Sequence, residues 1–368
     1  MPADLIKEAK ELPVVGQKAA EAHEAHLQAM IDRVNTKMEM HPDIHRLIGH
    51  NPLDMMRTNH QNHARFMVSV FKYHAHELLV KVVLWVYRTY HAHGFDFDYF
   101  PVELTAWQDA VTAHLDPSQT PEIAAIYQWL IDHHRILAKL AQERPEPVPE
   151  AEPELQNARE TFLQALLDGN SQKCLAIAEE IAKTAKGLET LYVAVIQPCL
   201  YKIGRLWERD EISVAQEHLA TATVGRLMAT IFPHLQAIPE AKGRAVVTAA
   251  TNEFHETGAR CVADLLELDG WEVHYLGANT PSDELIRYLK EVQPTILLVS
   301  VAMPFNIDPA CQMLAKILEA PDLADLSIMV GGLAFVSAPD LWQITGAHGY
   351  AADAKGAVAL ARTWWKEK

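Results

Sequence analysis

Ala245-Val246-Val247-Thr248-Ala249-Ala250-Thr251 is an apolar run that leads, through Asn252, into Glu253-Phe254-His255-Glu256-Thr257-Gly258 and then into a helical pattern at Ala259–Leu268. This order predicts a strand, a loop with one imidazole, and a helix. Ligands of open α/β sheets bind at the carboxyl ends of the strands. His255 is therefore the first candidate for a functional side chain, although one of 19 histidines can also lie on a loop by chance.

The alternation of strand and helix patterns continues to the end of the chain. The predicted strands are Ala245–Thr251, Glu272–Leu276, Thr295–Val301, Ser327–Val330 and Gly349–Ala351, and the predicted helices are Ala259–Leu268, Ser282–Val292, Pro309–Leu318, Ala338–Thr345 and Ala354–Trp365. Strands that alternate with amphipathic helices are typical of a parallel sheet with right-handed crossovers. The sequence thus predicts a doubly wound, five-stranded, flavodoxin-like α/β domain.

Small residues stand at the ends of the next predicted strands. Together with Glu253-x-His255-x-x-Gly258, they resemble the signature of the cobalamin-binding domain of methionine synthase and its relatives. The residues at the strand ends that carry this resemblance are Gly277, Ser300, Gly331 and Gly332. The residues that we expect to contact the cofactor are Glu253, Phe254, His255, Glu256, Thr257, Gly258, Gly277, Ser300, Val301, Gly331 and Gly332.

This resemblance implies a role for each part of the signature. His255 would be the lower axial ligand of cobalt, and the displaced nucleotide tail would run through a slot lined by the serine and the glycines. A neutral imidazole suits this role, and a neighbouring carboxylate fixes its tautomer. Glycine permits the close backbone approach that a buried tail needs. The family signature has aspartate where this chain has Glu253, whose carboxylate reaches one methylene further.

Length and composition place the chain among globular proteins of more than one domain, with 368 residues, 49% hydrophobic and 22% charged. No run of eighteen apolar residues occurs, and Met1–Lys10 lacks the apolar core of a secretion signal. The four cysteines have no metal-like spacing, which favours a reducing cytoplasm. A formal net charge of −16 opposes direct binding to nucleic acid. We expect a cytoplasmic protein that contacts neither membrane nor nucleic acid.

Residues 1–143 are predicted to form an all-helical, sensor-like domain, with a globin-like fold as one alternative. Apolar residues recur at helical spacing in Gln17–Met38, Asn62–Ala92, Val102–Leu115 and Pro121–Gln142. Residues 144–153 form a Pro/Glu linker, in which alternating prolines favour an extended spacer.

Histidine is concentrated in the first domain, where 14 of the 19 occur: His23, His26, His41, His45, His50, His60, His63, His74, His76, His91, His93, His114, His133 and His134. Solvated helix surface accounts for most of them in the simplest interpretation. The alternative is a pocket for heme or a bilin such as biliverdin, because such ligands need apolar walls and a few polar anchors. Its walls would be Phe71, Trp85, Tyr87, Tyr90 and Phe97, with His74 or His91 as polar contacts and Arg88 for a propionate. The segment has no cysteine, so a bilin would be bound without a covalent link.

Residues 154–240 contain four helical patterns, at Glu154–Asp168, Ser171–Thr184, Leu188–Asp210 and Ser213–His234, which predict a four-helix bundle before the α/β domain at residues 241–368. The fourth begins with a capping box, Ser213-Val214-Ala215-Gln216, that places Glu217 and His218 near its start.

Trp207, nine residues and then Glu217-His218 resemble the signature of the cobalamin-binding photoreceptor regulators typified by CarH. The resemblance implies that Trp207 covers the upper axial group and that the Glu-His pair lies beside it. Two departures stand out. Glu208 replaces a histidine that can take the upper cobalt position, and a His-rich acidic domain replaces a basic helix-turn-helix domain. By architecture the chain most resembles the photocobilins, which hold a cobalamin and a bilin.

The sequence therefore predicts a light-sensing signalling protein rather than an enzyme. Adenosylcobalamin is favoured over methylcobalamin, biliverdin or another tetrapyrrole is a candidate second ligand, and the partner is an unidentified signalling protein or a second copy of the chain. One alternative is a corrinoid methyl carrier of a methyltransferase system. Another is a heme- or cobalamin-responsive regulator that acts by protein contact without light.

Overall fold

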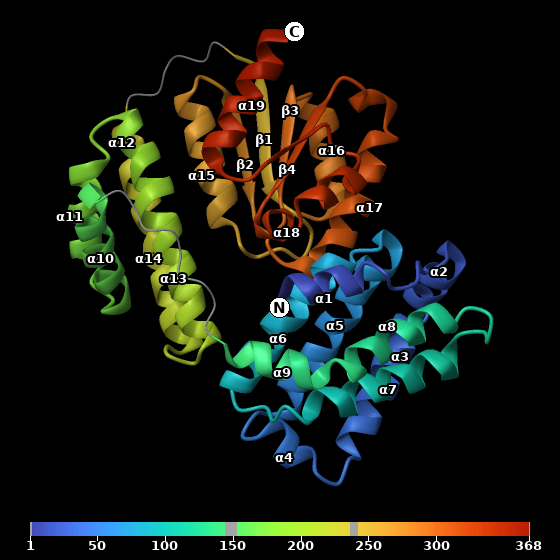
Figure 1. Ribbon diagram of the computed structural model, residues 1–368. Coiled ribbons are helices and arrows are strands. Elements are labelled where there is room, and N and C mark those ends of the chain that lie inside the picture. The colour runs from blue at the N-terminus through green and yellow to red at the C-terminus, as the bar shows by residue number, and fades with distance from the viewer. Residues whose placement is uncertain (1, 144–152, 236–241, 368) are drawn as a thin grey trace. The chain divides into compact units, whose positions relative to one another are not determined.

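The computed structural model describes residues 2–143, 153–235 and 242–367, which form two compact units (Figure 1). The first unit contains the described residues up to 143 together with Glu208–Asp210, and the second contains the remainder. Most of the predicted linker, residues 144–152, lies outside the described residues. Among the helices that the structure describes, none is both long and apolar enough to cross a membrane.

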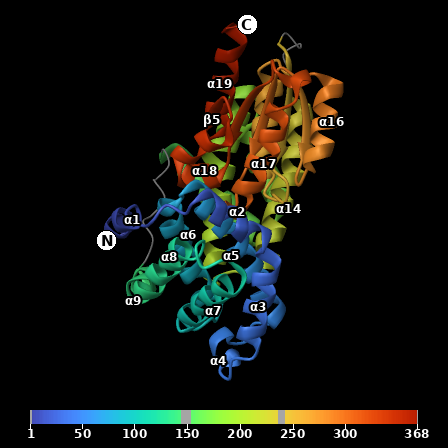
Figure 2. The same ribbon diagram turned by 90° about the vertical axis from the view of Figure 1, so that its right-hand side faces the viewer.

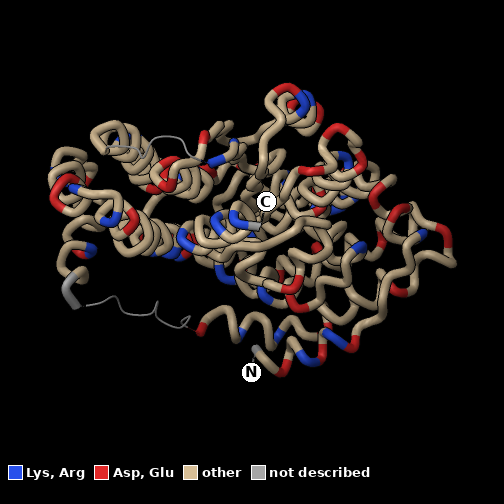
Figure 3. Tube along the Cα trace, turned by 90° about the horizontal axis from the view of Figure 1, so that it is seen from above, with Lys and Arg blue, Asp and Glu red and all other residues tan. Residues whose placement is uncertain are grey.

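The first unit is helical, as predicted. Its helices are α1 (Pro2–Ala9), α2 (Gln17–Ala25), α3 (Leu27–Glu39), α4 (Ile44–Ile48), α5 (Leu53–Tyr73), α6 (His76–Ala92), α7 (Tyr99–His114), α8 (Pro121–Asp132) and α9 (His134–Gln142). Helix α7 packs against α3 and α8, and α6 packs against α9 and α1. Acidic and basic residues are interspersed along the whole trace (Figure 3).

Three of the predicted helices in this unit are each divided in two. The pattern Asn62–Ala92 breaks at His74, which adopts a left-handed conformation (φ 53°) and ends α5. The pattern Gln17–Met38 breaks at His26, and Pro121–Gln142 breaks at His133. The apolar spacing continues across each break because both helices bury a face in the same core, so periodicity alone could not locate the ends.

Several histidines of the first unit are buried, so the interpretation of solvated surface is wrong for them. His23 and His60 are fully buried and His76 is 5% exposed. The ring of His60 contacts Asn35 Oδ1 at 2.6 Å and the Tyr99 hydroxyl at 2.8 Å. Burial lowers the pKa of His23 to about 3 and that of His60 to about 4. These side chains are neutral parts of the core.

Glu103 is a buried carboxyl group in the same core. It accepts a hydrogen bond from Trp107 Nε1 at 2.9 Å and is 6% exposed. Burial raises the pKa of Glu103 from 4.5 to about 7, although the bond from Trp107 opposes the shift. Between these two values the folded chain holds a proton that the unfolded chain has released, so this group makes the protein less stable as the pH rises.

The second unit begins with a helical layer. Its elements are α10 (Pro153–Leu167), α11 (Ser171–Ile181), α12 (Ala185–Thr190), the π-helical segment η1 (Leu191–Ile196), α13 (Gln197–Glu208), α14 (Val214–Ile231) and the short 3₁₀ turn η2 (Phe232–His234). Elements α12, η1 and α13 follow one another without a break. The predicted capping box is present, with Ser213 Oγ accepting from Gln216 N and the Gln216 side chain accepting from Ser213 N.

All five predicted strands are present, and every neighbouring pair is parallel. They are β1 (Arg244–Ala249), β2 (Glu272–Gly277), β3 (Ile296–Ser300), β4 (Ser327–Gly331) and β5 (Gly349–Ala351), in the order β2-β1-β3-β4-β5. The helices are α15 (Thr257–Leu268), α16 (Ser282–Val292), α17 (Ile307–Leu318), α18 (Leu333–Ser337) and α19 (Ala354–Glu367), with 3₁₀ turns η3 (Pro304–Asn306) and η4 (Pro321–Leu323). Helices α15 and α19 cover one face of the sheet, and α16 and α17 cover the other, toward the viewer in Figure 2 (Figure 2).

The predicted helix Ala338–Thr345 is wrong in type. The structure has a 3₁₀ segment, η5 (Pro339–Thr345), and places the unpredicted short helix α18 before it. Proline disfavours the α conformation in the residue before it, and Ala338 is extended in φ (−144°). The chain therefore breaks at Ala338 although the apolar spacing runs through it.

Strand order fixes the position of the candidate site. The order of the strands along the sheet reverses between β1 and β3, and ligands of such sheets bind at this point. Ala249 at the end of β1 pairs with Ser300 at the end of β3, and Ser300 pairs with Gly331 of β4. The loops that follow these strands, including the one that carries His255, therefore meet at one edge.

We predict that Glu103→Gln changes the pH dependence of stability. The variant gains stability over the wild type progressively from pH 4.5 to 7, because the wild type alone loses its proton there. The gain levels off above pH 7, at about 3 kcal/mol or less. Urea unfolding of both full-length proteins across this range measures the difference in their free energies of unfolding. The titration of the histidines contributes equally to both proteins and therefore cancels in this difference. Glu21→Gln, an exposed change on α2, is the control, and a pH-independent difference for Glu103→Gln would contradict the prediction.

Candidate functional site

His255 presents one ring nitrogen to solvent and is held by the other. Its Nδ1 lies 2.6 Å from Glu253 Oε1, and its main-chain N–H donates to the same oxygen at 3.0 Å. The side chain is 64% exposed, and within the described residues Nε2 makes no hydrogen bond. A carboxylate on Nδ1 selects the tautomer with the proton there, which leaves Nε2 as a lone-pair donor.

Hydrogen bonds from the segment after β3 hold the Glu253 side chain in place. Its side chain is fully buried, and Oε2 accepts hydrogen bonds from the amides of Ala302 (2.9 Å) and Met303 (2.8 Å) and from Asn306 Nδ2 (3.0 Å). Burial alone would raise the pKa of Glu253, but the bonds from His255, Met303 and Asn306 outweigh it and lower the pKa to about 2. The carboxylate is thus ionised and immobile.

Asn306 is a site residue that sequence reasoning missed. It is 1% exposed, and its Nδ2 also donates to the carbonyl of Asn252 at 3.1 Å, so it joins the loop after β1 to the loop after β3. A signal existed in the sequence, because Asn306 is the only strongly polar side chain in the stretch Val301–Ile307 that follows a predicted strand.

The glycine pair after β4 is required by the chain's own packing. Gly332 has φ +101°, and a Cβ there would lie 2.3 Å from the carbonyl oxygen of Val301. A Cβ on Gly331 would lie 2.8 Å from the carbonyl oxygen of Ala351. By contrast, Gly258 has an ordinary φ, and a Cβ there would meet no described atom within 4 Å other than those of its own helical turn and chain neighbours. The fold requires the first pair but not Gly258, which stands against open space.

Exposed apolar side chains gather at the same edge of the sheet. Phe254 is 69% exposed after β1, and Leu333 and Val336 are 47% and 39% exposed after β4. Ser300 is half-buried at the end of β3, whereas Val301 is fully buried, so Val301 can offer only its main chain. Glu256 and Thr257 start helix α15, and Gly277 ends β2 with φ +77°.

On the helical layer, the predicted pair Glu217-His218 forms a second carboxylate–imidazole unit. Glu217 Oε2 lies 2.6 Å from His218 Nδ1, and Glu217 Oε1 accepts from Thr221 Oγ1 at 2.9 Å. His218 is 75% exposed. The hydrogen bond to Glu253 raises the pKa of His255, burial opposes it, and the charges of Glu253 and then Glu217 add to the rise. Glu217 therefore lies close enough to His255 for its charge to act there.

Trp207 lies in the last turn of α13, half-buried against the core that the helical layer shares with α15 and the sheet. The structure thus places Glu217 within electrostatic range of His255, and Trp207 precedes Glu217 by one short hairpin along the chain.

The four predicted tetrapyrrole contacts in the first unit do not lie together. His74 is exposed at the end of α5, whereas His91 is in the last turn of α6, roughly 20 Å further along that helix at 1.5 Å per residue. Tyr87 is 2% exposed and stacks on Phe100 at 3.7 Å. The last turns of α6 carry Tyr87, the half-buried Arg88 and His91. Of the four predicted tetrapyrrole contacts, these three are the ones that lie near one another.

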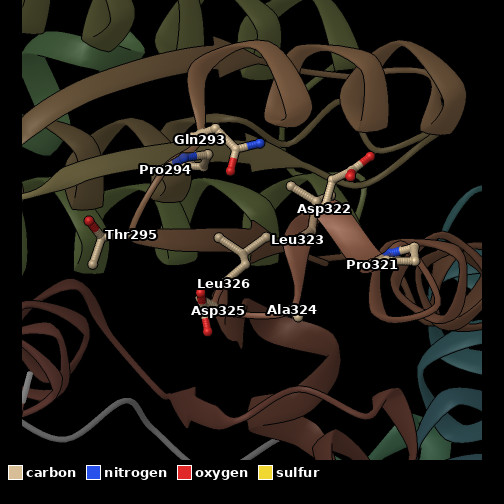
Figure 4. Close-up of a pocket in the computed structure, with 9 residues that line it drawn as sticks. All are labelled: Gln293, Pro294, Thr295, Pro321, Asp322, Leu323, Ala324, Asp325 and Leu326. Carbon is tan, nitrogen blue, oxygen red and sulfur yellow. The ribbon is translucent and has the colours of Figure 1, made fainter.

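Two pockets in the α/β domain are not lined by His255. One of about 250 Å³ is bounded by residues that precede β3 and β4, such as Thr295 and Leu326, and so lies at the opposite edge of the sheet (Figure 4). Another of about 450 Å³ lies beside α16 and is lined by Leu276, Asn279 and Tyr288. Neither contains the immobilised imidazole, and we therefore define the candidate site by the residues around His255.

Comparison with known families assigns the class. Residues 158–231 and residues 243–359 each match a family described as B12 binding domain. The protein is therefore a cobalamin-binding protein, in agreement with the exposed imidazole at the switch point of the sheet.

The chain is similar to transcriptional repressors and to corrinoid proteins. The chain is 27% identical over 194 residues to the HTH-type transcriptional repressor CarA and 26% identical over 186 residues to CarH, both from Myxococcus xanthus. These alignments cover 53% and 50% of this chain and 64% and 60% of the two repressors, so the chain spans less than two thirds of either. It is also 26% identical over 164 residues to dimethylamine corrinoid protein 1 of Methanosarcina mazei, which covers 44% of this chain and 74% of that protein.

We predict opposite effects from two glycine substitutions. Gly332→Ala destabilises the cofactor-free protein by about 2 kcal/mol or more, because the new Cβ meets a main-chain oxygen in a left-handed conformation. Gly258→Ala is neutral or slightly stabilising, because it lies in the first turn of α15 and alanine favours helix. Thermal unfolding without cobalamin compares the two, and equal losses of stability would refute the distinction.

Proposed function

We propose that the protein is a light-responsive cobalamin sensor. Adenosylcobalamin binds between the helical layer and the carboxyl edge of the sheet, with His255 Nε2 as the lower ligand of cobalt. The observation that carries this proposal is the exposed imidazole of His255 held by Glu253, with Glu217 of a second carboxylate–imidazole unit, Glu217–His218, close enough to act on it electrostatically.

The lower side of the site fits a cobalt corrin. His255 would hold the cobalt of a bound corrin through Nε2, because Glu253 fixes the proton of the imidazole on Nδ1. Phe254, Leu333 and Val336 provide apolar contact for the rim of the ring. Gly258 stands against open space, which suits close approach of a ligand. Ser300, Gly331 and Gly332 line the proposed path of the nucleotide tail.

The side chains proposed to cover the upper face of the cofactor favour a sensor over a methyl carrier. Trp207, Glu217 and His218 come from the helical layer and cover the upper axial position in this proposal. Glu217 is held at both oxygens, by His218 and Thr221, so its carboxylate is a fixed part of the cover. A methyl carrier has to open this face to partner enzymes. The similarity of this chain to dimethylamine corrinoid protein 1 nevertheless makes a methyl carrier the second candidate function.

Light sensing follows from the chemistry of the cofactor. Adenosylcobalamin, when bound, would supply a light-sensitive cobalt–carbon bond. Trp207 and the Glu217–His218 pair would be the side chains of this chain that respond to a change in the upper group, through repacking of the helical layer. A signal results only if the two arrangements differ in affinity for a partner, which is a signalling protein or a second copy of the chain.

We propose in addition that the first unit binds a bilin such as biliverdin without a covalent bond. Tyr87, Arg88 and His91 are the predicted contacts that share the end of α6, and His91 stacks on Phe97 with ring centroids 3.9 Å apart. The imidazole of His91 and the cation of Arg88 suit a conjugated ligand with propionate groups, which would have to share Arg88 with Glu208, whose Oε1 accepts from Arg88 Nη1 at 2.6 Å.

The decisive experiment is the absorbance of the full-length protein saturated in the dark with adenosylcobalamin and biliverdin, before and after green and red light. Corrin bands that change irreversibly in green light, with a bound red-absorbing band, are expected. Corrin binding without any light-driven change in shape or oligomeric state would favour the methyl carrier.

We predict that Trp207→Ala separates binding from response. The variant still binds adenosylcobalamin in the dark, because the lower ligand and the tail slot are unchanged. Its light-driven change in elution volume is lost, because the side chain that covers the upper group is gone. An unchanged response, measured by size-exclusion chromatography in the dark and after illumination, would exclude this role of Trp207.

We predict that Glu253→Gln weakens cobalamin binding about 10- to 100-fold, the usual cost of losing a residue that orients a metal ligand. Glutamine brings an NH₂ group into a site where Oε2 meets three donors, so it cannot keep both sets of bonds. Absorbance titration with hydroxocobalamin measures the affinity. Glu319→Gln, an exposed change after α17, is the control, and equal affinities of the two variants would contradict the prediction.

A further inference from the structure

The helix that carries Trp207 contains an inserted wide turn. Elements α12, η1 and α13 run continuously from Ala185 to Glu208, with π-helical geometry at Leu191–Ile196. Such turns are rare and are frequent at functional sites. One inserted residue rotates everything beyond it by about 100° around the helix axis, because an α-helix has 3.6 residues per turn. The direction of Trp207 therefore depends on this turn.

The main chain of the wide turn is supported from α10. Arg159 donates to the carbonyl oxygen of Ala194 from both Nε (3.1 Å) and Nη2 (2.9 Å). A π turn disturbs the regular amide-to-carbonyl pairing of the helix, and a buried carbonyl without a donor is costly. The charged, two-pronged donor of Arg159 compensates for this disturbance at Ala194.

One side chain of the wide turn, that of Tyr192, forms a hydrogen bond with helix α15. The Tyr192 hydroxyl donates to Asp264 Oδ2 at 2.6 Å, and the two residues are 1% and 8% exposed. Tyr192 belongs to the apolar core that the helical layer shares with the sheet, and Asp264 is a buried residue of α15. Burial raises the pKa of Asp264 to about 6, while the bond from Tyr192 and the charge of Arg260 oppose the rise. A buried carboxylate in such surroundings needs a donor, so this bond fixes the register of the two helices.

Helix α15 also begins directly after the lower-ligand loop. Its first residue, Thr257, follows His255 by two positions, and Asp264 lies two turns further along the same helix. The Tyr192–Asp264 hydrogen bond thus connects the wide turn, which sets the direction of Trp207, with helix α15, which follows the loop that carries His255.

We propose that Arg159, Tyr192 and Asp264 are positioning residues that hold the π turn and so keep Trp207 over the upper face of the bound cobalamin. The inference rests on the proposed function, in which Trp207 covers that face. Loss of the Tyr192 hydroxyl lets the wide turn relax, α13 rotates, and the upper axial position opens to small ligands while the lower side stays intact.

The test uses the full-length protein loaded with hydroxocobalamin and measures, by absorbance, the rate at which azide replaces the upper ligand. Tyr192→Phe is expected to raise this rate about tenfold, the effect of ~1.4 kcal/mol. Asp264→Asn is expected to stay near the wild-type rate, because the amide oxygen still accepts from Tyr192. Tyr201→Phe, which removes the hydroxyl of a 40% exposed tyrosine on α13, is the matched control.

A double variant separates positioning from general loosening of the fold. If Tyr192 acts through Trp207, then Tyr192→Phe in a Trp207→Ala background adds nothing to the rate of Trp207→Ala alone. An unchanged azide rate in Tyr192→Phe, or rates that multiply in the double variant, would overturn the inference. Arg159→Gln, expected to raise the rate in the same way, replaces Tyr192→Phe if that variant does not fold. An unchanged rate in Trp207→Ala would instead show that the proposed cover itself is wrong.

Discussion

The hydrogen bond between Glu253 Oε1 and His255 Nδ1 is the interaction on which the rest of the site depends. The two oxygens of Glu253 have separate tasks, because Oε1 orients the imidazole and Oε2 accepts three donors from the segment after β3. The carboxylate therefore ties together the loops that follow β1 and β3, at the reversal point of the sheet. Burial makes this tie rigid, since a fully buried carboxylate that lost its donors would carry an uncompensated charge.

The longer glutamate is accommodated by Asn306. Where the family signature has aspartate, Glu253 reaches one methylene further and meets the amides of Ala302 and Met303 directly. Asn306 fills the remaining acceptor site of Oε2 and also binds the carbonyl of Asn252. The departure from the signature is thus part of a complete set of hydrogen bonds, which explains how the chain keeps an immobilised imidazole with a different acid.

Much of the second unit could be predicted from sequence because its signals are local. The strands were visible as apolar runs, the capping box at Ser213 as a spacing, and the histidine loop as a signature. The unpredicted features arise from tertiary contacts. The wide turn at Leu191–Ile196 depends on Arg159 and Asp264, which lie far away in sequence, and the break at His74 leaves the apolar periodicity unchanged. Asn306 acts through a buried carboxylate that no spacing rule connects with it.

The central claim is that His255 is the lower ligand of cobalt. Electron paramagnetic resonance of the protein loaded with cobalt(II) cobalamin tests it most directly, because the ligand nitrogen splits the cobalt lines. Protein labelled with nitrogen-15 at histidine is expected to show the splitting change from three lines to two, since a protein imidazole then supplies the coupled nucleus. A three-line pattern that persists in the labelled protein would show that the cofactor's own base remains on cobalt, and would contradict the account.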